Sequence, residues 1–241
     1  MRDFITKNQF ITTCIINGIN TIFYFIGYSY GFDYTQLVFI TIITLDFNSI
    51  YFFLTFICDL SIFVFNSERL ENMNDILRNK IAHVINPISY FVTFMFWVLL
   101  ITGGIKDIFD DAISIIYTIY AHFIISILIV IDLFVADHKR HYFSWITLIF
   151  IFVYVFLYLI LLCVVTFKYD DPPYHFLEDI KIWALLLYFA LFSVIIVLCY
   201  LLQIYLMKIK YLYILKIKDV PQNYNEEINK VIQMTDISPE N

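Results

Sequence analysis

Long apolar runs separated by short polar segments set the pattern of this chain. Six runs are poor enough in charge and long enough to cross a membrane: 9–31, 37–65, 84–103, 112–136, 143–167 and 183–207. About 20 residues of helix span the roughly 30 Å of hydrocarbon in a bilayer. The pattern therefore predicts an all-α, polytopic membrane protein with six transmembrane helices.

The segments between and after these runs are short. Connections of roughly 5 to 20 residues leave no room for a separate soluble domain, so any active or binding site must lie in or at the mouth of the helix bundle. Residues 67–83 alternate charged and apolar positions and predict a short amphipathic surface helix. We therefore expect a transmembrane domain over 1–219 and a polar, disordered cytoplasmic tail over 220–241.

Basic residues predict the orientation of the six helices. Twelve of the fifteen Lys and Arg residues fall in the amino terminus, the second and fourth connections and the tail. The other three are Lys106, Lys168 and Lys181, in alternate connections. Because positive charge collects on the cytoplasmic side of membrane proteins, both termini are expected in the cytoplasm.

Composition agrees with the membrane assignment. The chain has 241 residues, of which 61% are apolar and only 15% charged, against roughly a quarter charged in a typical soluble domain. A net charge of −6 argues against a nucleic-acid partner. The four cysteines lie within the apolar runs without zinc-like spacing, so we expect no disulfide, no metal and no other cofactor.

Four ionisable side chains interrupt the apolar runs: Asp46, Asp59, His122 and Asp132. Such groups are costly at membrane depth and commonly mark function. His122 is the one histidine of five that lies deep in a run, whereas His83 and His138 lie at run edges, where a solvated imidazole is expected. Asp59 and Asp132 lie near the cytoplasmic ends, within reach of the headgroup region.

Two stripes of polar residues follow helical spacing. The first is Thr41, Thr44, Asn48, Thr55 and Asp59, and the second is Ser114, Thr118, His122 and Ser126. Hydrogen bonding between packed helices is the ordinary interpretation of such stripes. A threonine hydroxyl also becomes a nucleophile when a base takes its proton, and a neutral imidazole can be that base. A threonine of the first stripe and His122 could therefore perform acyl transfer.

Short motifs along the chain resemble the family of the androgen-induced and androgen-dependent TFPI-regulating proteins. The motifs occur in the family's order from about residue 37 to 180. They are Phe39-Ile40-Thr41, Asn48 and Cys58-Asp59-Leu60-Ser61; Pro87 and Phe96-Trp97; His122, Asp132 and His138; and Tyr174 with Phe176-Leu177-Glu178.

The resemblance implies a six-span membrane hydrolase that cleaves fatty acid esters of hydroxy fatty acids. Its threonine nucleophile and its histidine correspond to Thr41 and His122. The partners implied are membrane lipids and a lipid ester substrate, with no prediction of oligomeric state, in the endoplasmic reticulum or plasma membrane. The chain departs from the family pattern at Ile119, where a second histidine is expected, at Thr44, where an acid is expected, and at Pro172 and Pro173, which replace a tryptophan.

Two other functions fit the same sequence. A small proton-linked transporter could use Asp46 and His122 as its titrating groups within the membrane. A non-catalytic, lipid-binding scaffold would retain the fold and accommodate the departures at Ile119 and Thr44. The absence of an internal repeat argues against the transporter.

Overall fold

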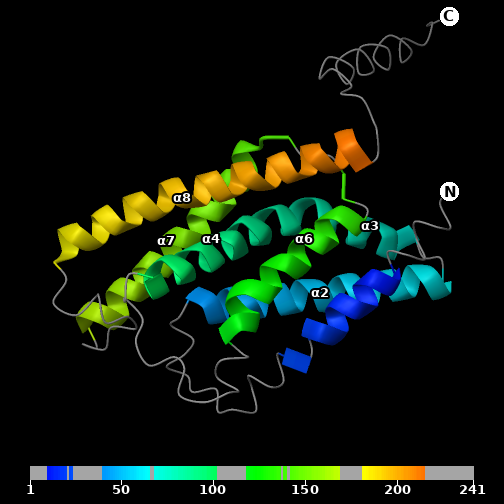
Figure 1. Cartoon of the computed structure of the whole chain (residues 1–241), viewed down its shortest axis with the longest axis horizontal. Helices are drawn as coiled ribbons and strands as arrows, with labels where there is room; N and C mark the ends of the chain where they lie inside the picture. The colour runs from blue at the N-terminus through cyan, green and yellow to red at the C-terminus, as the bar shows by residue number, and fades with distance from the viewer. Residues whose placement is uncertain are drawn as a thin grey trace, which may run out of the picture. The chain divides into compact units, whose positions relative to one another are not determined.

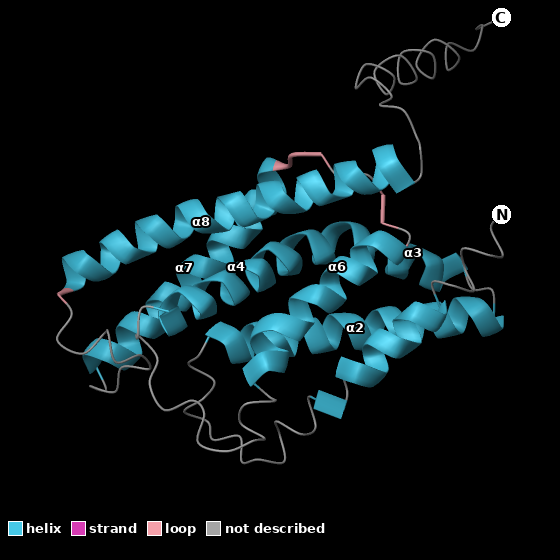
Figure 2. Ribbon diagram, viewed as in Figure 1, coloured by secondary structure: helices cyan, strands magenta, loops and turns pink. Residues whose placement is uncertain are grey.

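A computed structural model describes most of the apolar part of the chain. The described residues are 10–20, 22–23, 40–65, 68–101, 118–136, 138–139, 142–168 and 181–214. They are helical apart from short connections and the ends of helices, and contain no strand (Figure 2). The all-α prediction is thus confirmed, while the predicted tail over 220–241 lies outside the described residues.

The chain divides into two compact units, Met1–Met207 and Lys208–Asn241. The described helices besides Phe10–Asn20 are α2 (Ile40–Phe65), α3 (Glu68–Ile76), η2 (Leu77–Ile81), α4 (Ala82–Ile101), η3 (Tyr120–Ile124), α6 (Ile125–Val135), α7 (Trp145–Lys168), α8 (Ile182–Ile209) and η5 (Lys210–Ile214). In the second unit only 208–214 is described, as the end of α8 and the π-helical η5.

Four described helices are long and apolar enough to cross a membrane: Ile40–Phe65, Arg69–Ile101, Trp145–Phe167 and Ile182–Leu212. They coincide with four of the six predicted spans. Two shorter apolar helices, Phe10–Asn20 and Tyr120–Val135, lie within the other two predicted spans. The chain is therefore a helical, multi-pass membrane protein with four candidate spans among its described residues.

Broad apolar surfaces on α7 and α8 fit a lipid environment. On α7, Trp145, Ile146, Ile149 and Phe150 are all more than half exposed. Soluble monomers rarely expose apolar patches of this extent, because water contact with them is unfavourable. In a bilayer the same side chains contact lipid tails at no such cost.

The helix that contains the third predicted span, 84–103, begins earlier than the sequence predicts. Instead of a separate surface helix over 67–83, the segments α3, η2 and α4 follow one another without interruption from Glu68 to Ile101. In α3 Asn74 is buried and the other described side chains are at least partly exposed, including Met73 and Ile76. Leu77 and Arg78 of η2 are buried. The exposed surface predicted for this segment is thus seen in α3, whereas η2 belongs to the interior.

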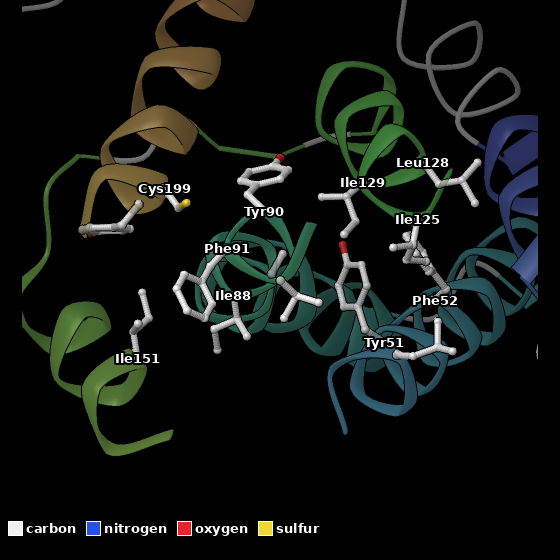
Figure 3. Close-up of a cluster of buried hydrophobic side chains, with 14 of the residues drawn as sticks. Tyr51, Phe52, Ile88, Tyr90, Phe91, Ile125, Leu128, Ile129, Ile151 and Cys199 are labelled. Atoms are coloured by element: carbon white, nitrogen blue, oxygen red, sulfur yellow. The ribbon is translucent and has the colours of Figure 1, made fainter. Parts of the chain in front are cut away.

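Helix α4 occupies the centre of the first unit. It packs against α2, α6 and α7. Helices α2 and α6 run in the same direction and α4 runs against both (Figure 1). Apolar side chains from these helices and from α8 form the core (Figure 3), including Tyr51 and Phe52 of α2, Ile88 and Phe91 of α4, Ile125 and Ile129 of α6, and Cys199 of α8.

Besides η5, two described segments of the first unit form a widened, π-helical turn. In η3 the N–H of Ile125 bonds to the carbonyl of Tyr120, five residues back, and in η2 the N–H of Ala82 bonds to Leu77 in the same way. Such turns are rare and often occur at functional positions, because the additional residue redirects the neighbouring side chains. His122 lies in the first turn and Arg78 in the second.

Candidate functional site

Thr41 is the second residue of α2 and is partly buried. The stripe that it begins faces the inside of the bundle, as its spacing predicts, because Thr44, Asn48, Thr55 and Asp59 are all buried. The stripe was expected to pack between helices, and its middle residue does so. Asn48 donates from Nδ2 to the Thr44 carbonyl at 2.7 Å and to Ser89 Oγ of α4 at 2.8 Å.

His122 lies in η3 with its ring held by an aromatic neighbour. The imidazole stacks on Phe96 of α4, with ring centroids 3.7 Å apart and planes within 9°. Its Nδ1 atom is buried and has no hydrogen-bond partner among the described residues. Buried polar atoms are nearly always paired in native proteins, so this nitrogen is suited to a partner that arrives with a ligand.

Contacts through α4 relate the depth of Thr41 to that of His122. Asn48 of α2 bonds to Ser89 of α4. Thr41 lies seven residues before Asn48, and Phe96 lies seven residues after Ser89. Because α2 and α4 run in opposite directions, Thr41 and Phe96 lie at the same level. Phe96 in turn stacks on His122.

A direct contact between α2 and α6 relates the same two residues. Tyr51 of α2 donates from its hydroxyl to Asp132 Oδ2 of α6 at 3.0 Å. Thr41 precedes Tyr51 by ten residues and His122 precedes Asp132 by ten, which is about 15 Å along each helix. The two helices run in the same direction (Figure 1), so this contact places Thr41 and His122 toward the same end of the bundle. Arg78 also joins Asp132 to Asp59, which follows Thr41 by eighteen residues, or about 27 Å of helix.

Thr41 and His122 form no direct hydrogen bond with each other in the described structure. The nearest polar neighbour of Thr41 on its own helix face is Thr44, whose hydroxyl lies 3.1 Å from the Tyr154 hydroxyl of α7. Both Nδ2 hydrogens of Asn48 are used in helix packing. The Thr44–Tyr154 contact therefore joins α2 to α7 one helical turn after Thr41.

An apolar pocket lies beside this site. It reaches α2 at Ile40, the residue directly before Thr41. Every described lining residue is apolar or aromatic: Ile40; Phe91, Met95 and Leu99 of α4; Val155, Tyr158, Leu159 and Leu162 of α7; and Leu185, Tyr188, Phe189 and Phe192 of α8. The pocket can hold a hydrocarbon chain, and it offers no charged side chain to a headgroup.

At Asp59, about 27 Å along α2 from Thr41, a buried arginine joins the two span aspartates. Arg78 of η2 is only 2% exposed. Its Nη2 donates to Asp59 Oδ2 at 2.6 Å and its Nη1 to Asp132 Oδ1 at 3.1 Å. Isolated charges inside a protein are very costly, and this ion triad avoids that cost by pairing one cation with two carboxylates.

Further hydrogen bonds complete what we call the Arg78 cluster: Arg78, Asp59, Asp132, Tyr51, Thr13, Asn74 and His138. His138 is fully buried and links Asp132 Oδ2 through Nε2 at 2.9 Å to the Arg78 carbonyl through Nδ1 at 2.8 Å. Thr13 donates to Asp59 Oδ2, and Asn74 donates to Asp59 Oδ1. The cluster thus joins five parts of the chain to one another: the helix Phe10–Asn20, α2, the α3–η2 segment, α6 and the residues that follow α6.

These contacts correct two expectations. Asp59 and Asp132 are not exposed to headgroups but buried against Arg78, and His83 and His138 are not solvated but about 1% exposed or less. Gln203 Nε2 of α8 donates to His83 Nδ1 at 2.7 Å. The signal for the cluster was present in the sequence: two carboxylates in apolar spans require a cationic partner, and Arg78 is a basic residue on the amphipathic segment.

Comparison with known proteins assigns the chain to a family. A family model described as FAR-17a/AIG1-like protein matches residues 8–216. No curated protein and no solved structure matches the chain. The family resemblance drawn from the sequence motifs is confirmed by this match, although the motif at Tyr174 lies outside the residues that the structure describes.

Proposed function

Because the chain belongs to the FAR-17a/AIG1-like protein family, we propose that it is a membrane-embedded esterase that hydrolyses fatty acid esters of hydroxy fatty acids. Thr41 is the nucleophile and His122 the general base. The observation that supports the proposal is the position of these two residues toward the same end of the bundle, which we infer from the Asn48–Ser89, Phe96–His122 and Tyr51–Asp132 contacts. We infer six spans with both termini in the cytoplasm, in the endoplasmic reticulum or plasma membrane.

The reaction proceeds in two steps. His122 takes the proton of the Thr41 hydroxyl while Thr41 Oγ1 attacks the ester carbonyl. The bond to the alcohol oxygen then breaks, the hydroxy fatty acid leaves with the proton from His122, and an acyl-threonine remains. Water, deprotonated by His122, attacks this acyl group, releases the free fatty acid and restores the Thr41 hydroxyl.

The surroundings of His122 support its role as base. Stacking on Phe96 limits rotation of the imidazole, and the unpartnered Nδ1 is available to a reacting proton. Holding the reacting groups in position supplies a large share of the rate enhancement in such reactions. An apolar, two-chain ester already dissolves in the bilayer, so a site among the helices meets its substrate there.

The departure at Ile119 leaves this pair intact. Ile119 is 41% exposed and precedes η3, and it does not belong to the buried face that carries Tyr120 and Ala121. Thr44, the other departure, is occupied by its bond to Tyr154. Neither position supplies the groups that the proposed reaction uses.

The direct test is ester hydrolysis by the purified protein in detergent, with a palmitic acid ester of hydroxystearic acid. Thr41→Ala and His122→Ala are each expected to lower kcat by at least about a hundredfold, within the range for loss of a nucleophile or base. Thr55→Ala is the matched control, because Thr55 lies on the same stripe and, among the described residues, its hydroxyl donates to the Phe52 carbonyl of its own helix.

Other outcomes would contradict the proposal. Undiminished hydrolysis by Thr41→Ala would remove the assigned nucleophile. Absence of hydrolysis by folded wild-type protein would favour the lipid-binding scaffold. Proton-coupled solute uptake that survives Thr41→Ala but is lost in Asp46→Asn would favour the transporter.

A further inference from the structure

We propose that the apolar pocket between α4, α7 and α8 binds the fatty acyl chain that is transferred to Thr41, and that Leu159 sets the chain length accepted. This inference rests on the proposed esterase function. It assigns a substrate region to residues that, apart from Ile40, lie outside the sequence motifs.

The position of the pocket relative to Thr41 is the first argument. Ile40 lines the pocket and is the residue directly before Thr41 on α2. The Tyr154 hydroxyl of α7 lies 3.1 Å from the hydroxyl of Thr44, one helical turn after Thr41. Val155, the next residue of α7, lines the pocket. The pocket wall is therefore tied to the helix that carries the nucleophile.

The walls of the pocket form a path suited to an extended chain. On α4, Phe91, Met95 and Leu99 follow one another at intervals of four residues and share a helix face. Leu185, Phe189 and Phe192 of α8 follow the same kind of spacing. From Phe91 to Leu99 the wall rises about 12 Å, close to the length of nine or ten methylene groups.

The chemistry of the lining identifies the occupant. The described lining contains aliphatic and aromatic side chains and no charged group. A carboxylate or a headgroup would lose its hydration there without a partner, which costs several kcal/mol at least, whereas a hydrocarbon chain would not. The acyl part of the ester fits this requirement, and the carboxylate of the hydroxy fatty acid must lie elsewhere.

Leu159 is the position at which the pocket can be narrowed. Its side chain is 9% exposed and contacts the pocket, along with Leu162 and Leu185. Leu157, two residues away on the same helix, is 60% exposed and does not line the pocket. Leu159→Trp and Leu157→Trp therefore add the same volume to the same helix, inside the pocket and outside it.

The experiment compares kcat/KM for two esters of hydroxystearic acid, one hexadecanoyl and one hexanoyl, in purified wild type and variants. Leu159→Trp is expected to lower the hexadecanoyl-to-hexanoyl ratio at least tenfold, and Leu157→Trp to leave it unchanged. Leu162→Phe, a smaller change, is expected to lower the ratio in the same direction. Shortening the hydroxy fatty acid instead of the acyl chain should not reproduce these differences.

An unchanged ratio in both Leu159→Trp and Leu162→Phe, with hydrolysis still dependent on Thr41, would overturn the pocket assignment and leave the esterase proposal standing. A second readout tests the pocket assignment without requiring ester hydrolysis. A photoreactive hexadecanoic acid with its diazirine near the methyl end is expected to label peptides of α7 or α8 in wild type and in Thr41→Ala, but much less in Leu159→Trp. Equal labelling of Leu159→Trp and Leu157→Trp would contradict the inference even if no hydrolysis were found.

Discussion

The hydroxyl of Tyr51 donates a hydrogen bond to Asp132 at 3.0 Å, and this contact joins α2 to α6 ten residues after Thr41 and ten residues after His122. The proposed nucleophile and base are thus positioned by contacts about two to three helical turns away from them. Asp132 also bonds to Arg78 and His138, so the Arg78 cluster fixes the relative depth of the helices that carry the site.

Removal of the arginine should therefore destabilise the protein strongly. Arg78→Met leaves Asp59 and Asp132 buried without a cation, a change that typically costs about 3–5 kcal/mol. For a chain of this size the expected fall in Tm is about 6 °C or more, measured by thermal unfolding in detergent. Arg69→Met, on the exposed side of α3, is the matched control and should change Tm little. Equal Tm values for the two variants would show that the ion triad is not buried as described.

Loss of the Phe96 ring, which stacks on the His122 imidazole, should impair catalysis more than substrate binding. In Phe96→Leu the imidazole loses its stacking partner, and we expect kcat to fall about tenfold with KM nearly unchanged, because an interaction that positions the base acts on the chemical step. Steady-state kinetics on the long-chain ester measures both constants.

Phe94→Leu provides the comparison for this substitution. Phe94 lies on α4 two residues earlier and is half exposed, away from His122. The kcat of Phe94→Leu should equal that of the wild type. An equal loss in both variants would indicate a general effect on α4 and would remove the positioning role of Phe96.

The hydrogen bond from Asn48 to Ser89 should contribute to stability by the modest amount that is usual between membrane helices. A double-mutant cycle with Asn48→Ala and Ser89→Ala is expected to give a coupling energy of about 0.6 kcal/mol, with an upper bound of about 1.7 kcal/mol. Chemical unfolding in mixed micelles measures it. A coupling energy of zero would mean that this contact does not hold α2 and α4 in register.

The six-span topology predicts that neither terminus reaches the extracytoplasmic side. A glycosylation acceptor tag on the amino or carboxyl terminus should stay unmodified in microsomes, because twelve of fifteen basic residues assign these ends to the cytoplasm. An acceptor inserted within residues 169–180, on the predicted opposite side, should be glycosylated. Modification of exactly one terminus would imply an odd number of spans.

Much of the fold could be predicted from the sequence because apolar length alone identifies membrane helices. The stripe from Thr41 to Asp59 was also predictable, since helical spacing assigns its residues to one face and four of them are buried. The position of Thr41 and His122 relative to one another could not be predicted, because it depends on the contacts of Phe96 and Tyr51 with other helices and on the widened turn at His122.

Arg78 shows a second limit of sequence reasoning. It counts among the basic residues of a cytoplasmic connection, where charge alone predicts solvent exposure. Its burial follows from the helix continuing without interruption through η2, which brings Arg78 between Asp59 and Asp132. The ion triad forms where η2, α2 and α6 meet, so the sequence of any one of these segments does not predict it.

The central claim is that Thr41 is a nucleophile activated by His122, and covalent labelling tests it most directly. A fluorophosphonate probe is added to purified protein, and the modified residue is identified by mass spectrometry of the α2 peptide. The account predicts one adduct on Thr41 in the wild type, none in Thr41→Ala and a much slower reaction in His122→Ala. Labelling of Thr41→Ala at the wild-type rate, or an adduct on another residue that His122→Ala leaves unchanged, would contradict it.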